Sequence, residues 1–145
     1  MTNGKASNIG LAIVGCGTIG RIRAKFARDY PGIGWLGLCD TDEPLGRKLA
    51  KEVSADFFTT DYEELLARSE VQATMIVTDE NSHTEPTLSA VEQGHKLFIE
   101  KPLATNARES EAILKAIEGN NIDAVVGYTQ RFRRRFLAIK ERLLT

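Results

Sequence analysis

Short apolar runs alternate with amphipathic segments along most of the chain. Short runs made mostly of apolar or aromatic residues occupy residues 9–14, 34–39, 56–59, 73–77, 96–99 and 124–127. Runs of this length without polar alternation are typical of strands that are covered on both faces of a parallel sheet. Between them, apolar residues recur every three or four positions, as they do on helices. The pattern predicts six strands that alternate with helices.

Three polar residues mark the starts of helices. Asp42 and Asp61 are placed to cap the helices after the second and third strands. Asn106, followed by Glu109, forms a capping-box pattern before the helix that follows the fifth strand. Gly119 is expected to end that helix in the left-handed conformation.

Apolar residues at helical spacing mark one face of each of three helices. They are Ile19, Ile22 and Phe26 in the first helix, Ile113, Leu114 and Ile117 in the helix capped by Asn106, and Phe132, Phe136, Ile139 and Leu143 in the last helix.

Alternating strands and helices predict an α/β fold, a doubly wound Rossmann-type parallel sheet with strand order 3-2-1-4-5-6, because parallel crossovers are right-handed. Ligands of such sheets bind at the carboxyl ends of the strands. That edge should collect residues 15–20, 40, 78–83, 100–102 and 128–131. We expect a single domain over residues 1–130, followed by an amphipathic helix at 131–145.

The first strand runs into glycines spaced as G-x-G-x-x-G. Gly15 allows a sharp turn off the strand, Gly17 allows the backbone to approach a pyrophosphate, and Gly20 allows the first helix to pack on its strand. The phosphates would then lie over Thr18 and Ile19 at the helix N-terminus, where unpaired N–H groups attract anions. Since turns use glycine widely, the surrounding strand and helix are what support a dinucleotide site.

Asp40 follows the second strand, 20 residues after Gly20. An acid at this distance is placed to accept a hydrogen bond from a ribose 2′-hydroxyl, and it repels a 2′-phosphate. Asp42 adds to that repulsion, so NAD is the expected cofactor. Arg47 and Lys48 in the next helix keep NADP open as an alternative.

Composition narrows the class of protein. The chain has 145 residues, 42% hydrophobic and 27% charged, with a net charge of −1, which gives no general basic excess for nucleic acid. No apolar run has the length of a membrane span, and a cytoplasmic location is expected.

Cys16 and Cys39 end neighbouring strands, and buried thiols are favoured over a disulfide in a reducing compartment. The two separated histidines and these cysteines predict no metal site.

Three segments in order carry a resemblance: GCGTIG at 15–20, EKPLA at 100–104 and VGYTQRF at 126–132. Together they resemble the amino-terminal domain of the Gfo/Idh/MocA oxidoreductases. The resemblance implies NAD- or NADP-dependent hydride transfer to or from hydroxyl groups of sugars and cyclitols. It also implies a second domain, absent here, that follows the last helix, completes the substrate pocket and often forms a dimer.

The resemblance extends the list of candidate cofactor contacts beyond the glycine turn and Asp40. They are Thr78, His83, Glu100, Lys101, Pro102, Gln130 and Arg131. In the loop after the fourth strand, the family often has T-P-N-x-x-H. Thr78 and His83 match this pattern, but Asp79 and Glu80 occupy the proline and asparagine positions.

Lys101 is the candidate catalytic residue. Hydride leaves a carbinol carbon as its hydroxyl proton is taken or its alkoxide is stabilised, and an ammonium beside the nicotinamide can serve both needs. Pro102 is expected to fix the turn that aims it, and Glu100 to hold the turn or Lys101 rather than act as a base. The alternative is an exposed lysine without a role. His83 either approaches the nicotinamide or is a capping or solvent-facing residue, and His95 is assigned no role.

The last 15 residues carry six basic side chains and one acid, Glu141. Because apolar residues are interleaved at helical spacing, a solvated basic face on an amphipathic helix is favoured over nucleic-acid binding. Its apolar face should be partly exposed, which invites self-association.

The expected function is the dinucleotide-binding part of an oxidoreductase that acts on a small polyol or sugar, catalytically incomplete without the second domain. A stand-alone module that senses NAD(H) without chemistry is the alternative, and a fold that binds no dinucleotide is a third.

Overall fold

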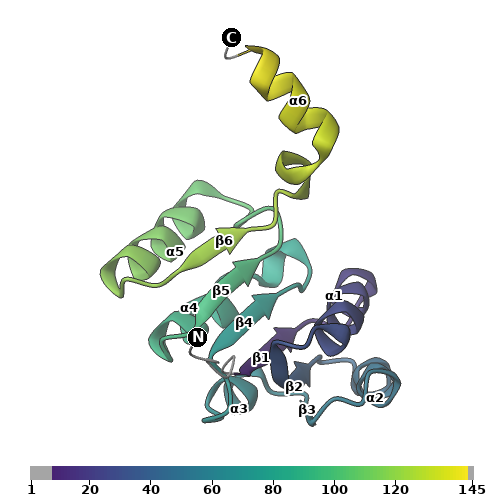
Figure 1. The fold of residues 1–145 in the computed structure, drawn as a ribbon. Coiled ribbons are helices and arrows are strands. Elements are labelled where there is room, and N and C mark those ends of the chain that lie inside the picture. The colour runs from purple at the N-terminus through teal and green to yellow at the C-terminus, as the bar shows by residue number, and fades with distance from the viewer. Residues whose placement is uncertain (1–7, 144–145) are drawn as a thin grey trace, which may run out of the picture.

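One sheet of six parallel strands organises the structure, a computed structural model that describes residues 8–143 (Figure 1). The strand order is β3-β2-β1-β4-β5-β6, which confirms the predicted doubly wound topology. The strands are β1 (Ile9–Val14), β2 (Ile33–Cys39), β3 (Phe57–Thr59), β4 (Ala73–Ile76), β5 (Lys96–Ile99) and β6 (Ala124–Val126).

Helices cover both faces of the sheet. They are α1 (Thr18–Asp29), α2 (Glu43–Glu52), α3 (Tyr62–Leu66), α4 (Thr84–Glu92), α5 (Ala107–Gly119) and α6 (Arg134–Leu143), with short 3-10 turns at η1 (Glu80–Ser82) and η2 (Thr129–Phe132). Side chains of β1 alternate between two buried clusters: Leu11 and Ile13 pack with α1 and α2, whereas Ala12 and Val14 pack with α3, α4 and α5. In Figure 1, α6 extends away from these layers, and none of its residues is buried.

The capping predictions are confirmed in part. Asp42 accepts a hydrogen bond from Leu45 N at 3.0 Å, and Asp61 accepts one from Glu63 N at 2.9 Å. Asn106 accepts one from Glu109 N at 2.9 Å, but the Glu109 carboxylate accepts from Thr84 Oγ1 at 3.0 Å instead of returning to the cap.

The prediction for the end of α5 is wrong. Gly119 lies within the helix, and the left-handed residue is Asn121, with φ of 53°. Asparagine tolerates this conformation better than other residues with a side chain. Of the predicted apolar face, Ile113 is fully buried and Ile117 is partly buried, whereas Leu114 is half-exposed.

The apolar face of α1 is not the face that packs on the sheet. The buried residues of this helix are Gly20, Ala24 and Ala27. The predicted apolar face is exposed instead: Ile19 is 45% exposed, Ile22 46% and Phe26 73%. A Cβ added at Gly20 would lie 1.9 Å from the carbonyl oxygen of Gly15. The helix therefore sits so close to the strand that only small side chains fit between them.

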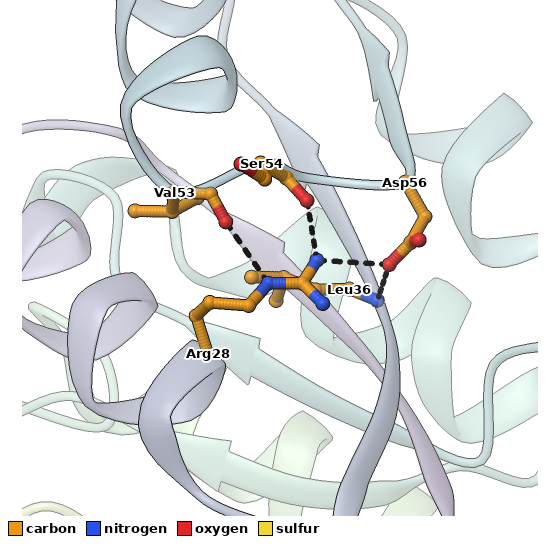
Figure 2. A network of polar contacts seen from close by, with 5 residues as sticks. All are labelled: Arg28, Leu36, Val53, Ser54 and Asp56. Carbon is orange, nitrogen blue, oxygen red and sulfur yellow. Dashed lines mark hydrogen bonds and ion pairs between the residues drawn. The ribbon is translucent and has the colours of Figure 1, made fainter.

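A network around Arg28 holds the amino-terminal side of the sheet, away from the predicted site (Figure 2). The guanidinium donates to Val53 O at 2.9 Å, to Ser54 O at 2.6 Å and to Asp56 Oδ2 at 2.9 Å, and that carboxylate also accepts from Leu36 N. Burial raises the pKa of Asp56, but the hydrogen bonds from Arg28 and Leu36 outweigh it and leave that pKa below its ordinary value.

We expect Arg28→Ala to lower the free energy of unfolding by about 1–2 kcal/mol, because two backbone carbonyls and the Asp56 carboxylate lose a charged donor whose side chain is 29% exposed. Urea denaturation measures this loss. Lys25→Ala is the matched control on the same helix, since the Lys25 side chain is 48% exposed and its partner Glu52 keeps its ion pair with Arg21, so the loss should be under about 0.5 kcal/mol. Equal losses in the two variants would contradict this account of the network.

His95 is a core residue at the start of β5. It is 5% exposed, its Nδ1 lies 3.0 Å from Thr74 Oγ1, and burial lowers its pKa below 6.5. The unfolded chain therefore binds a proton at a higher pH than the folded one does. Stability from this residue is complete above pH 6.5 and is lost as the pH falls below that value.

Replacing His95 by Gln should remove this part of the pH dependence. We expect the stability gap between the parent and His95→Gln to shrink between pH 7.5 and pH 5, measured by urea denaturation at both values. A gap that stays constant or widens on acidification would show that His95 is not the group responsible.

Candidate functional site

The turn between β1 and α1 has the geometry of a phosphate cradle. Gly15 has a φ of +105°, and a Cβ there would lie 2.6 Å from Val77 O, so no other residue fits. A Cβ at Gly17 would meet nothing within 4 Å. Packing therefore requires Gly15 and Gly20, while Gly17 faces open space where a ligand's phosphates could approach the backbone.

The N-terminus of α1 opens at this cradle. Gly17 is its cap without a side-chain hydrogen bond, and the first turn contains no acidic residue. The N–H groups of this turn have no partner within the helix, so Thr18 and Ile19 present donors and the positive end of the helix dipole. This arrangement can hold an anion without a basic side chain.

A cavity of about 790 Å³ lies over this edge of the sheet. Gly15, Gly17, Thr18, Ile19, Asp40 and Thr78 line it, as predicted for the cofactor site. Its size is within the range of cofactor sites. Of the described residues that line it, four are acidic, and none is lysine, arginine or histidine; the acids are Asp40, Asp79, Glu85 and Glu109.

Asp40 is fixed by the backbone around it. Its Oδ2 accepts from Cys16 N at 2.6 Å, and its Oδ1 accepts from Asp42 N at 2.8 Å. A carboxylate has about four acceptor positions, so two remain for ribose hydroxyls. The side chain thus has the location and acceptor capacity predicted from its spacing.

The cysteines beside this carboxylate are buried free thiols. Cys16 Sγ lies 3.6 Å from Cys39 O, to which its thiol donates. Burial, with a further contribution from the charge of Asp40, raises the pKa of each thiol to about 12. Neither is therefore a nucleophile at neutral pH.

Lys101 lines a second, smaller cavity of about 440 Å³. Gln130 and Arg131 line it as well, so the structure divides nine of the predicted contacts between two cavities. The other four line neither cavity; they are Gly20, His83, Glu100 and Pro102. The side chain of Lys101 is exposed, and its peptide bond to Pro102 is cis. Tyr128, half-exposed on the same wall, belongs to the segment 128–131 that the sequence placed at this edge, although it was not among the individual candidate contacts.

His83 occupies the N-cap position of α4, as one alternative expected, but its side chain makes no capping hydrogen bond, and the solvent-facing alternative is wrong. It is 1% exposed, with Nδ1 2.8 Å from Pro102 O and Nε2 3.4 Å from Thr78 O. The ring lines neither cavity. Through these two contacts, the His83 ring joins the loop after β4 to the turn after β5. Its position supports these segments and does not face either cavity.

Glu100 forms an ion pair that the sequence did not indicate. Its Oε1 lies 2.6 Å from Nη2 of Arg23, a residue of α1. Its Oε2 lies 3.4 Å from the backbone nitrogen of Lys101, which donates to it. The contact is consistent with the expected role of Glu100 in holding the turn.

The described part of the chain contains neither a metal-binding cluster nor a membrane-spanning helix. Among residues 8–143, no group of three or more histidine, cysteine or acidic side chains could hold a metal ion. No helix within the same range is long and apolar enough to cross a membrane.

The chain matches known proteins over most of its length. Residues 9–128 match an oxidoreductase family described by its NAD-binding Rossmann fold. The chain is 32% identical to inositol 2-dehydrogenase of Gluconacetobacter diazotrophicus over 135 residues, which are 91% of this chain and 40% of that protein. It is 27% identical to scyllo-inositol 2-dehydrogenase (NAD(+)) of Bacillus subtilis over 133 residues, 91% of this chain and 39% of that protein.

A solved structure confirms the fold. Scyllo-inositol dehydrogenase from Lactobacillus casei, with bound NAD(H) and scyllo-inositol, superimposes with a TM-score of 0.87 at 22% identity, over 94% of this chain and 41% of that one. The chain thus spans about two fifths of the length of these relatives.

The cradle makes a direct prediction about Gly17. We expect Gly17→Ala to fold normally, because its Cβ meets nothing in the protein, and to weaken NAD binding about tenfold or more, because that Cβ occupies the space of the pyrophosphate. Isothermal titration with NAD measures the change. Gly119→Ala is the matched control, since its Cβ also meets nothing but lies on α5, and its binding should be unchanged. If Gly17→Ala bound NAD as strongly as the parent chain, the phosphates would not bind over Gly17, and this interpretation of the turn would be wrong.

Proposed function

Because this chain belongs to the Gfo/Idh/MocA oxidoreductase family, we propose that it is the NAD-binding part of a dehydrogenase acting on a sugar-like or cyclitol-like alcohol. The observation that carries the proposal is the open cradle at Gly17, which shares one sheet edge with Asp40 and Lys101. Two of the relatives bear the names of inositol dehydrogenases, which supports the cyclitol class.

Each part of the edge has a separate task in this proposal. The α1 N-terminus holds the pyrophosphate through backbone N–H groups, and Asp40 accepts from the adenosine ribose. NAD supplies the hydride acceptor when it is bound. Lys101, at the wall of the second cavity, orients the substrate hydroxyl and stabilises the oxygen as its proton leaves. Gln130 and Arg131 line the same cavity and contribute polar contacts there.

NAD is preferred to NADP in this proposal. The main cavity has four acids among its described lining residues and no cation to receive a 2′-phosphate. Neither Arg47 nor Lys48 lines this cavity, and Arg47 is paired with Glu43 at 2.7 Å.

The chain is catalytically incomplete in this proposal. Lys101 lines an open cavity, and the chain covers about two fifths of its relatives. We propose that α6 leads into the substrate domain and that its exposed Phe136, Ile139 and Leu143 are covered there or by self-association. The unbonded thiols of Cys16 and Cys39 suit the reducing conditions of the cytoplasm.

Titration with NAD, NADH and NADP tests the cofactor part of the proposal. We expect NAD and NADH to bind, NADP to bind more weakly, and Asp40→Ala to lose about tenfold in NAD affinity, because a charged acceptor is removed from the ribose. Asp42→Ala is the control: it loses the cap of α2 but no residue lining the cavity, so NAD affinity should stay within about twofold.

Failure to bind any of the three cofactors would refute the proposal for this chain. Steady turnover of a polyol by the 145-residue chain would refute its catalytic incompleteness. NAD binding without polyol oxidation in the protein that includes the second domain would favour the sensing alternative.

A further inference from the structure

An ion pair connects the cofactor-binding helix to the turn that carries Lys101. Arg23 of α1 donates to Glu100 Oε1 from Nη2 at 2.6 Å and from Nε at 3.2 Å. The two side chains are 27% and 13% exposed, respectively. Because both are largely shielded from water, this contact is stronger than the exposed pairs elsewhere on α1.

The surroundings leave the Glu100 carboxylate little freedom. The Arg23 guanidinium lies over the ring of Phe98, 4.8 Å from its centroid. Gly127 at the end of β6 closes the other side, because a Cβ there would lie 2.8 Å from the Phe98 ring and 3.0 Å from Glu100 Oε2. Residues from α1, β5 and the position directly after β6 thus surround the Glu100 carboxylate.

Lys101 directly follows this acid but is not paired with it through its ammonium. Among residues 8–143, the ion pair of Glu100 is with Arg23, and no ion pair is formed by the Lys101 side chain. The Lys101 backbone N–H donates a hydrogen bond to Glu100 Oε2 at 3.4 Å. The Lys101 side chain lines the open cavity instead.

We propose that Arg23 is a positioning residue that binds the Glu100 carboxylate and so leaves the Lys101 ammonium free for the substrate oxygen. The proposal rests on the proposed function for the role of Lys101. It assigns a purpose to the acid of the EKP segment: Glu100 orients the turn through the Lys101 backbone, and Arg23 prevents it from capturing the Lys101 side chain.

Removal of Arg23 alone should turn Glu100 toward Lys101. A largely shielded carboxylate without a cation is unfavourable, and the adjacent residue carries the nearest positive charge in the sequence. Pairing would keep the Lys101 amine protonated and less reactive. Removal of both charges, Arg23 and Glu100, should leave Lys101 as free as it is in the parent chain.

Competitive labelling with acetic anhydride at pH 8 measures this effect, because only the neutral, accessible amine reacts. The acetylation rate of Lys101 is compared with that of Lys115, an exposed lysine on α5, in the same sample by mass spectrometry. We expect Arg23→Met to lower the Lys101-to-Lys115 ratio roughly two- to fivefold, the effect of one solvent-accessible ion pair. Arg23→Met combined with Glu100→Gln should restore the parent ratio.

Arg21→Met is the matched control, because Arg21 lies on the same helix and its ion pair is with Glu52 at 2.8 Å. Its ratio should equal that of the parent chain. An unchanged ratio in folded Arg23→Met, with folding checked by circular dichroism, would overturn the proposal.

Glu100→Gln alone keeps the test decisive if Arg23→Met does not fold. We expect this variant to leave the ratio within about twofold of the parent, since Arg23 already neutralises the carboxylate. A severalfold rise that persists when Arg23→Met is added would show that Glu100 pairs with Lys101 in the parent and would overturn the proposal. Labelling needs no cofactor, so failure of NAD binding and failure of this inference are separate results.

Discussion

The close contact between α1 and the sheet determines the geometry of the site. A Cβ at Gly20 would lie 1.9 Å from Gly15 O, and one at Gly15 would lie 2.6 Å from Val77 O. Such distances require that both positions lack side chains. With the helix in this place, its first N–H groups point over the carboxyl ends of the strands, and its second turn brings Arg23 to Glu100. The proposed phosphate site and the Lys101 turn therefore both depend on the position of α1.

The same contact explains where the sequence pattern misled us about α1. Hydrophobic periodicity assumes that the largest apolar residues face the core, but a helix this close to its strand can bury only Gly20, Ala24 and Ala27. Ile22 and Phe26 are consequently displaced to the outer surface. The strand order and the caps at Asp42 and Asp61 were predictable because they depend on short-range pattern and on the right-handedness of parallel crossovers.

The candidate site shows the same division between local and distant information. The cradle and Asp40 could be predicted because the glycine spacing and the following strand fix them locally. The environment of His83 could not, since its Nδ1 partner is the carbonyl oxygen of Pro102, on a different loop. Nor could Arg23, since an arginine on a predicted helix surface gives no sign of a partner as distant in sequence as Glu100.

The separation of charge between the two cavities is consistent with the proposed binding of phosphates by the backbone. Backbone N–H groups and a helix dipole can bind a pyrophosphate, so the main cavity needs no basic side chain and tolerates four acids. Lys101 and Arg131, the cations at this edge, line the second cavity, where no described lining residue is acidic. Under the proposed function, these two positive charges lie where an alcohol oxygen would gain negative charge. Backbone binding of phosphate would then require neither of them at the main cavity.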